Sequence, residues 1–400
     1  MGISEGYGIG SLKPGVCTSS TRPASPFDGQ VVYMTDVDQT AVWDGSAWVG
    51  LDLSRDRNVV INGAMQVAQR GTSTASITTT SYNTADRWFT DNISQGTWTQ
   101  SVEADAPTGS GFRNSLKMLC TTASASPASG SRIGVGQRFE GQNIQKFAKG
   151  TASAKPFVMS FWTKSNVTGT YVIELFDTDN TRYVSASYTI SASATWEYKT
   201  VTFPADTTGA FNNDNNESLA FRFWLGAGSS YSSGTPLNTT WGAPGDTVRI
   251  AGQVNVAAAT NNYWQVTGVQ LEAGAVATPF EFEDHETTLS KCQRYYFLLV
   301  SGTAKSFGVG AMITATEMQT HIYFPTTMRT TPTLVATSGS NYYDFVRNGG
   351  DDLFNSLTIV QASSTGAGVG NATEIAGTVG HAGRLLTIDS LASIAFSAEL

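Results

Sequence analysis

The feature that most constrains the fold of this chain is a change of hydrophobic period between residues 261 and 297. Residues 264–272 alternate, with one face made of Thr267, Val269 and Leu271 and the other of Gly268, Gln270 and Glu272. Such period-2 alternation is typical of a half-buried strand. Gly274 and Pro279 then end the strand, since glycine frees the backbone and proline removes a ladder donor. From residue 284 the apolar spacing becomes helical, with acidic residues first and basic residues last, as a helix dipole favours. We therefore expect the last strand of one β-domain, a short helical linker over residues 284–295, and a new domain from residue 296.

The composition favours an all-β chain of more than one domain. Four hundred residues exceed the length of one ordinary domain. Only 14% of the residues are charged, and there are 40 glycines together with many Ser, Thr and Asn residues. Exposed helices need charged outer faces, whereas short strands are joined by Gly, Asn and Asp turns. With 11% aromatic residues, the chain has enough apolar surface to form packed cores.

Charge and hydropathy disfavour several classes of partner. The net charge is −8 and there is no basic run, so we expect no nucleic-acid surface. No run approaches the ~18 apolar residues of a membrane helix, and residues 1–8 lack the basic and apolar regions of a signal peptide. The three cysteines, Cys17, Cys120 and Cys292, fit neither a disulfide framework nor a zinc site. We therefore expect synthesis in a reducing cytoplasm and no insertion into a membrane.

Residues 1–57 are expected to form an arm and a small β-hairpin module. Residues 1–21 are rich in Gly and Ser and lack periodicity, which is typical of a flexible arm. Residues 22–51 contain two Asp-Gly turns between short β-rich runs, a pattern that predicts a hairpin or a three-strand meander. About thirty residues bury too little surface to be stable alone. Trp43 and Trp48 are therefore expected to pack on the next domain or on a neighbouring chain.

Two larger β-domains are expected to follow the N-terminal module. Residues 58–283 contain about ten strand patterns separated by Asp, Asn and Gly turns, with one helical turn near residues 142–147. This arrangement predicts a central jelly-roll β-sandwich of two sheets. Residues 296–400 again show short strand patterns and predict a C-terminal β-sandwich.

Residues 341–352 of the last domain allow two interpretations. They place three aromatic residues and mixed charges between two predicted strands. The segment is either a strand buried in the sandwich or an exposed recognition loop. In the second case a sugar would be bound by stacked rings and hydrogen-bonding side chains, contributed by Tyr342, Tyr343, Asp344 and Phe345.

No catalytic constellation is evident, and we expect neither enzymatic activity nor a cofactor. His285, His321 and His381 have no metal-ligand spacing. Asp residues in turns normally bond their own backbone, and this applies to the close acidic pairs Asp36 and Asp38, Asp177 and Asp179, and Asp351 and Asp352. Asp86 leaves two alternatives. It is a turn carboxylate that pairs with Arg87 or caps nearby amides, or it is a ligand of a bound calcium ion.

A series of short motifs is spread from residue 22 to residue 400. They are the tryptophan-containing module of residues 22–48, segments 58–71, 82–88, 134–141 and 158–165, Leu-Glu-Ala-Gly at 271–274, Thr-Pro-Phe-Glu at 278–281, Cys-Gln-Arg-Tyr-Tyr at 292–296, and segments 324–333 and 396–400. In order and spacing, these motifs resemble those of bacteriophage tail-fibre and related virion structural proteins. The resemblance implies a central domain similar to carbohydrate-binding modules.

The resemblance also implies a non-enzymatic tail fibre or other host-adhesion component, located in the virion tail and assembled as a homotrimer. Trimers would bury sheet edges and exposed tryptophans. We expect residues 1–57, with Trp43 and Trp48, to attach the protein to other tail or baseplate proteins. Residues 296–400 are the candidate receptor-binding domain for a host-surface glycan. Two alternatives stay open: a decoration or connector protein without a receptor role, and a glycan-depolymerising tailspike, which the missing β-helix repeat disfavours.

Overall fold

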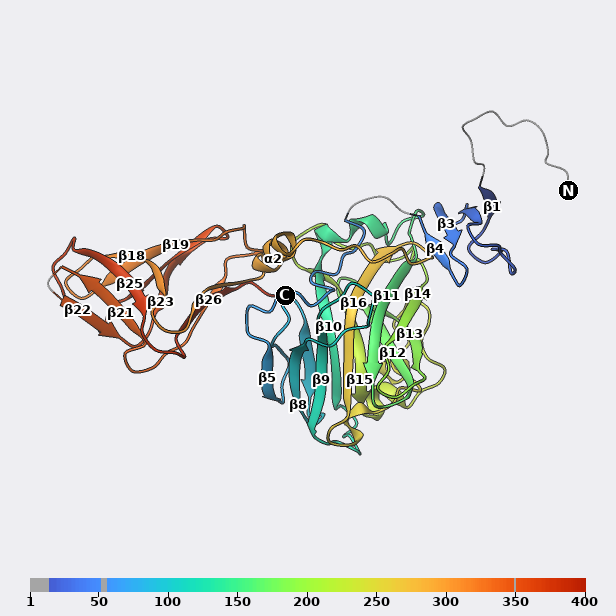
Figure 1. The fold of residues 1–400 in the computed structure, drawn as a ribbon, viewed down its shortest axis with the longest axis horizontal. Helices are drawn as coiled ribbons and strands as arrows, with labels where there is room; N and C mark the ends of the chain where they lie inside the picture. The colour runs from blue at the N-terminus through green and yellow to red at the C-terminus, as the bar shows by residue number, and fades with distance from the viewer. Residues whose placement is uncertain (1–13, 52–55, 349) are drawn as a thin grey trace, which may run out of the picture.

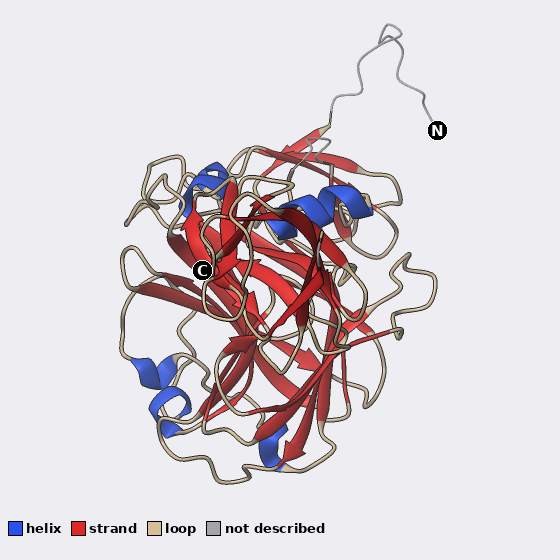
Figure 2. Ribbon diagram, turned by 90° about the vertical axis from the view of Figure 1, so that its left-hand side faces the viewer, coloured by secondary structure: helices blue, strands red, loops and turns tan. Residues whose placement is uncertain are grey.

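The computed structural model describes residues 14–51, 56–348 and 350–400. The described chain is almost entirely β-structure and has three parts (Figure 1). A small N-terminal module lies at one end, a large sandwich lies in the middle, and a second β-domain follows helix α2 (His285–Gln293). Figure 2 shows how few helices accompany the strands. The expectation of an all-β, multi-domain fold is confirmed. Of the expected arm, residues 1–13 lie outside the described residues.

The N-terminal module is one four-stranded sheet in the order β1 (Gly15–Cys17), β2 (Val31–Met34), β3 (Gln39–Trp43) and β4 (Trp48–Gly50). Strands β2, β3 and β4 form an antiparallel meander, and β1 pairs with β2 in parallel. The turn before β4 is fixed by the Asp44 carboxylate, which accepts hydrogen bonds from the amides of Ser46 and Ala47. The module has a small apolar core that Val276 of the sandwich completes; its other members are Val32, Met34, Val37 and Ala41.

The middle part is a sandwich of two six-stranded sheets. The β15 sheet has the order β13 (Arg182–Ile190), β12 (Gly169–Asp177), β15 (Glu217–Ala227), β10 (Arg132–Glu140), β7 (Phe89–Ile93) and β6 (Ser81–Tyr82). The β16 sheet has the order β14 (Glu197–Phe203), β11 (Phe157–Ser165), β16 (Tyr263–Ala273), β9 (Ser115–Thr122), β8 (Thr97–Glu103) and β5 (Ser73–Ile77). Rings from the two sheets interdigitate, since the ring centroid of Phe223 lies 5.0 Å from that of Phe161 and 5.1 Å from that of Trp264.

Short helices lie in the loops of the sandwich. The 3₁₀ helices η1 (Gly141–Asn143) and η2 (Gln145–Phe147) occur where the sequence predicts a helical turn. The others are α1 (Ser229–Ser232), η3 (Asp246–Val248) and η4 (Val256–Ala258). Within the residues that the structure describes, no helix is long and apolar enough to span a bilayer.

Strand β16 departs from its expected alternation at one point. Its core-facing residues are Trp264, Val266, Val269 and Leu271, so the inward spacing skips one residue. The register against β11 shifts between Ser160 and Trp162, which marks a β-bulge, and Gly268 adopts φ 61° there. The prediction that Thr267 shares the face of Val269 and Leu271 is therefore wrong. Thr267 pairs with Trp162 on the outer face.

The C-terminal domain packs two sheets around a second apolar core. The smaller sheet has the order β17 (Tyr296–Ser301), β26 (Ser393–Ser397) and β20 (Thr333–Ala336). The larger has the order β22 (Gly350–Phe354), β21 (Tyr343–Arg347), β25 (Ala382–Thr387), β18 (Ser306–Met312), β19 (Met318–Tyr323), β24 (Gly366–Asn371) and β23 (Thr358–Ala362).

Buried polar contacts hold the C-terminal domain to the sandwich. Glu399 pairs with Arg70 and Arg87, and the side chains of Arg87 and Glu399 are only 1% and 7% exposed. Glu140, at the end of β10, forms a two-point ion pair with Arg294, with distances of 2.7 and 2.6 Å. The two β-domains are therefore joined directly after α2, at Arg294, and again at residue 399.

Candidate functional site

An aromatic pair stands on the outer face of the β16 sheet. Every second side chain of β11 points into the core, namely Phe157, Met159 and Phe161. Trp162 and Lys164 therefore point outward. Trp162 lies directly opposite Tyr198 of β14, and their ring centroids are 5.4 Å apart. Tyr198 is 46% exposed and Trp162 is half-buried. Two adjacent strands thus present a continuous aromatic surface to solvent.

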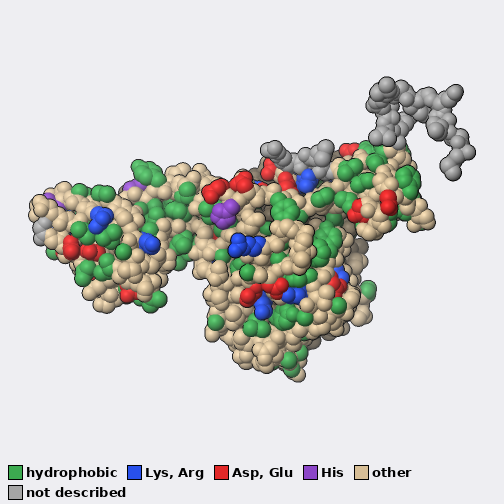
Figure 3. Space-filling model, viewed as in Figure 1, with side chains coloured by type: hydrophobic (Ala, Val, Ile, Leu, Met, Phe, Trp, Pro, Cys, Tyr) green, Lys and Arg blue, Asp and Glu red, His purple; other side chains and the backbone are tan. Residues whose placement is uncertain are grey.

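Polar groups surround this aromatic pair. The Lys164 ammonium lies 5.0 Å from the ring centroid of Trp196. Asp105 pairs with Lys164 and accepts hydrogen bonds from Trp196 Nε1 at 3.2 Å and Gln265 Nε2 at 3.1 Å. We call this set the aromatic patch; it consists of Trp162, Trp196, Tyr198, Lys164, Asp105 and Gln265. Figure 3 shows acidic and basic side chains gathered beside hydrophobic ones on the sandwich.

Two carboxyl groups of this region, those of Asp105 and Glu197, are held ionised. Burial by itself raises the pKa of Asp105, but hydrogen bonds from Lys164 and two neutral side chains lower that pKa below its ordinary value. Burial likewise opposes ionisation of Glu197, whereas Lys199 and two backbone amides lower the pKa of Glu197. Each carboxylate is an acceptor whose donors are already in place, so neither carries a proton near neutral pH.

A groove of about 500 Å³ adjoins the aromatic patch. One wall is the outer face of β14, which contributes Tyr198, Thr200 and Thr202. The other wall is the N-terminal module, which contributes Trp48. Sites for small ligands commonly measure about 300–1,000 Å³ and combine apolar walls with a few hydrogen-bonding groups. This module groove has both, because the rings of Trp48 and Tyr198 and the hydroxyls of Thr200 and Thr202 line it together.

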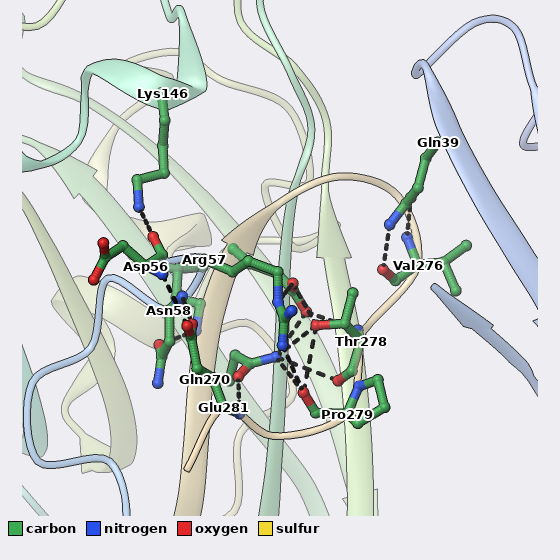
Figure 4. Close-up of polar contacts among 12 residues, drawn as sticks. Gln39, Asp56, Arg57, Asn58, Lys146, Gln270, Val276, Thr278, Pro279 and Glu281 are labelled. Carbon is green, nitrogen blue, oxygen red and sulfur yellow. Dashed lines mark hydrogen bonds and ion pairs between the residues drawn. The ribbon is translucent and has the colours of Figure 1, made fainter. Parts of the chain in front are cut away.

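The segment that follows β16 fixes the N-terminal module in place (Figure 4). The Gln39 side chain accepts hydrogen bonds from the amides of Ala275 and Val276, both at 3.2 Å, and donates one to the Val276 carbonyl at 2.9 Å. The Gly50 amide donates to the Ala277 carbonyl at 3.0 Å. A side chain at residue 50 would not fit, because its Cβ would lie 2.8 Å from Gln39 Nε2. The module therefore forms a fixed wall of the groove.

The same segment holds the start of the sandwich. The Glu281 carboxylate accepts hydrogen bonds from the backbone amides of Asp56 and Asn58 at 2.8 and 3.0 Å (Figure 4). Gln270 of β16 accepts a hydrogen bond from the Glu281 amide at 2.8 Å. Residues on both sides of the boundary between module and sandwich are thus bonded to one loop.

Trp43 and Trp48 lie together in the N-terminal module. Their rings form an edge-to-face pair with centroids 5.7 Å apart. Trp48 also packs against the module core that contains Val276. The expectation that Trp43 and Trp48 pack on the next domain or on a neighbouring chain stays a prediction, although Val276 of the sandwich belongs to the core that Trp48 touches. A role of Trp43 and Trp48 in attachment to a particle stays a prediction.

The segment proposed as a recognition loop is a core strand. Tyr343 and Phe345 are fully buried in β21, and the Tyr343 ring stacks on Phe354 at 5.3 Å. Both rings fill the space between the two sheets of the domain, so neither can stack on a ligand. Tyr342 is half-buried against the same core, and Asp344 is 8% exposed. The prediction of an exposed loop is wrong, and the buried-strand alternative is confirmed. Residue 349 of this segment lies outside the described residues.

Asp86 is a buried carboxylate that caps nearby amides. It accepts hydrogen bonds from the backbone amide of Gln69 at 3.0 Å and from the Gln69 side chain. Burial raises the pKa of Asp86 to about 6. The expected pairing with Arg87 is wrong, because Arg87 turns to Glu399 instead. Among the described residues, no group of three or more acidic, His or Cys side chains is arranged to hold a metal ion.

The sequence analysis did not single out the aromatic patch. It identified the strands that carry Trp162 and Tyr198, but the face on which two residues meet depends on the register between strands. One local signal was present. Tyr198 shares its period-2 face with Thr200 and Thr202, whereas the apolar side chains of β14 lie on the other face. An aromatic residue on a hydroxyl-rich face indicates an exposed ring.

Comparisons with known proteins give partial similarities of structure. No protein-family model matches the chain, and no curated protein matches it. The enzymatically active domain of tailspike protein 4 of bacteriophage CBA120 is 13% identical, with a TM-score of 0.30; the match covers 58% of this chain and 24% of the tailspike chain. TmCBM61, solved with β-1,4-galactotriose, is 8% identical over 54% of this chain and 99% of its own, with a TM-score of 0.27. The C-terminal family 22 carbohydrate-binding module of Clostridium thermocellum Xyn10B is 8% identical over 56% of this chain and 99% of its own, with a TM-score of 0.28. Nothing about the ligand or activity of this chain follows from similarities of this size.

Proposed function

We propose that this chain is a non-enzymatic, glycan-binding adhesin. The observation that carries the proposal is the outward pair of Trp162 and Tyr198, which leads directly into the module groove. A pyranose ring has an apolar face of C–H groups that packs on aromatic rings, while its hydroxyls need donors and acceptors. Lys164, Asp105 and Gln265 supply charged and amide groups at the edge of the rings. Ligand sites commonly combine apolar surface with a few placed polar groups in this way.

The ionised state of Asp105 and Glu197 supports binding rather than hydrolysis at the aromatic patch. Glycoside hydrolysis needs two carboxyl groups that face one bond, of which one keeps a proton to give to the leaving oxygen. At the patch the pKa values of Asp105 and Glu197 are both lowered, and each side chain is paired with a lysine. Neither is suited to act as a general acid.

The biological setting belongs to the same proposal. The order of motifs that resembles tail fibres supports a place in a virion tail, with attachment through residues 1–57. Because the module and the sandwich share a core through Val276, an attached module would hold the aromatic patch at a set distance from the particle. A homotrimer and a host-surface glycan as receptor complete the proposed adhesin.

Variants that each remove one of the two aromatic rings, Trp162 or Tyr198, test the proposal. We expect Trp162→Ala and Tyr198→Ala each to weaken binding of the purified full chain to host-surface polysaccharide at least tenfold, about 1.4 kcal/mol. The measurement is titration calorimetry with the isolated polysaccharide. Phe27→Ala is the matched control, because it removes a ring that is 68% exposed and belongs neither to the aromatic patch nor to the lining of the module groove. Wild-type affinity in both variants would refute the patch as the binding site, and release of reducing ends from the polysaccharide would refute the non-enzymatic role.

A further inference from the structure

A second groove lies on the C-terminal domain, far along the chain from the aromatic patch. It has a volume of about 330 Å³ and lies on the outer face of five neighbouring strands, β25, β18, β19, β24 and β23. We call it the glycine groove; its lining includes Val309, Gln319, His321, Val360, Gln361 and Gly368. None of the residues placed in Sequence analysis as ligand-binding contributes to it.

The groove exists because one strand has no side chains on its outer face. In β24, Ala367 and Val369 point into the domain core, so Gly366, Gly368 and Gly370 face outward. The floor is therefore bare backbone between the side chains of β19 and β23. A Cβ on Gly368 would meet its nearest neighbours only at 3.8–3.9 Å, an ordinary contact. Glycine at residue 368 is thus not required by packing, and its effect is to leave the groove open.

Apolar and aromatic side chains stand beside the floor. His321 and Tyr323 lie on the same face of β19, with ring centroids 4.6 Å apart. The His321 ring lies over Gly366, where a Cβ would come within 2.7 Å of Nε2. Tyr323 is 80% exposed and Val309 is 71% exposed. Such exposed apolar surface in a concave site commonly marks an interaction site.

The chemistry of the lining side chains limits which ligands suit the glycine groove. Of the described residues that line it, none is Asp, Glu, Lys or Arg. The polar groups are the amides of Gln319 and Gln361 and the imidazole of His321, which donate and accept hydrogen bonds without a fixed charge. Next to the lining, Arg384 is paired opposite Val309, and Glu317 accepts a hydrogen bond from Gln319 at 2.6 Å. Because these two charges are opposite in sign, the groove offers an anionic sugar no net attraction. A neutral sugar would find amide groups for its hydroxyls and aromatic side chains for the apolar face of its ring.

We infer that the glycine groove binds a neutral saccharide, with a sugar ring on the floor at Gly368 beside His321, its hydroxyls on Gln319 and Gln361, and Tyr323 at the rim next to His321. The inference rests on the proposed function in that it adds a second binding site to the same adhesin. The main competing occupant is a second copy of this chain. A stable protein interface takes about 20–30 residues from each side, whereas ten residues line this groove. The size of the groove therefore favours a small ligand.

The experiment uses the full chain with the aromatic patch disabled. Neutral oligosaccharides and their carboxylated or sulfated counterparts are immobilised, and binding is measured for wild type and for the double variant Trp162→Ala/Tyr198→Ala. We expect the double variant to keep binding to a neutral oligosaccharide and not to the acidic counterparts. Adding Gly368→Val, which fills the floor, or Tyr323→Ala is expected to weaken the remaining binding at least tenfold. Leu353→Ala, which removes an exposed side chain elsewhere on the domain, is the matched control and is expected to have no effect.

The outcomes separate this inference from the proposed function. If wild type binds and the double variant does not, the aromatic patch is the binding site and the inference that the glycine groove binds a saccharide is refuted. If wild type binds no oligosaccharide, both are refuted. If Gly368→Val changes the mass of the protein in solution, measured by light scattering, and leaves binding unchanged, the groove is an interface between copies and the inference is overturned.

Discussion

At the scale of single residues, Lys149 shows how an ammonium group neutralises buried acids in the sandwich. Its ammonium lies 2.5 Å from an oxygen of Asp177 and 3.1 Å from one of Asp206. It also donates to the carbonyls of Thr208 and Gly209 at 3.1 and 2.6 Å. The side chain is 0% exposed. Four oxygens of the kind that calcium prefers thus surround an ammonium group. The sequence analysis assigned Asp177, together with Asp179, to a simple turn, because spacing in sequence does not show which cation reaches a carboxylate.

Removal of the Lys149 charge leaves two buried carboxylates without their shared partner. We expect Lys149→Met to lower the free energy of unfolding by about 3–5 kcal/mol, the usual cost of breaking a buried ion pair. Urea denaturation followed by tryptophan fluorescence measures the change. Lys199→Met is the control, because its pair with Glu197 is partly exposed and is expected to contribute less than about 1 kcal/mol. Equal midpoints for the two variants would contradict the structural role of Lys149.

At the scale of elements, the existence of strands was easier to predict than the faces they present. Alternation in residues 264–272 predicts β16, but the bulge at Gly268 moves Thr267 to the outer face. For residues 341–352 the sequence predicted either a buried strand or an exposed loop, because aromatic residues suit both a core and a binding surface. Burial of Tyr343 and Phe345 depends on the sheet opposite them, which no local pattern contains. The positions of Trp162 and Tyr198 depend likewise on register between strands.

The loop after β16 acts as part of the N-terminal module, and this leads to a prediction about Cys17. Val276 is 5% exposed in the module core, against which Cys17 packs. We expect Val276→Asp to undock the module and speed labelling of Cys17 by a thiol reagent at least tenfold. Burial raises the pKa values of the Cys120 and Cys292 thiols, so both should stay unreactive and serve as internal controls.

Val335→Asp provides the matched variant for this measurement, since residue 335 is 46% exposed and lies in the C-terminal domain. It places the same charge on the protein without touching the module. If Cys17 reacts at the wild-type rate in Val276→Asp, the module holds its structure without the sandwich, and the shared core is not what stabilises it.

At the scale of the whole molecule, the contacts of Glu399 decide how freely the C-terminal domain moves. We expect Glu399→Ala to broaden the distribution of particle dimensions in small-angle X-ray scattering, because Arg87 loses the carboxylate that ties the domain to the sandwich. The buried cation left behind should also lower the free energy of unfolding by several kcal/mol. Glu374→Ala, which removes contacts to Asn355 and Asn371 inside the same domain, should leave the scattering curve unchanged. An unchanged curve for Glu399→Ala would mean that the contacts of Glu140 suffice.

The junction formed by the contacts of Glu399 and Glu140 also has a mechanical consequence. A domain that hangs on one peptide linker swivels when it is pulled sideways, so little torque passes through the linker. Here the C-terminal domain is fixed to the sandwich at Arg294 through Glu140 and, on the returning chain, at Glu399 through Arg87. Sideways drag on this domain would therefore twist the sandwich. Through the core shared at Val276, the twist would reach the N-terminal module. The three parts would therefore deform together as one body.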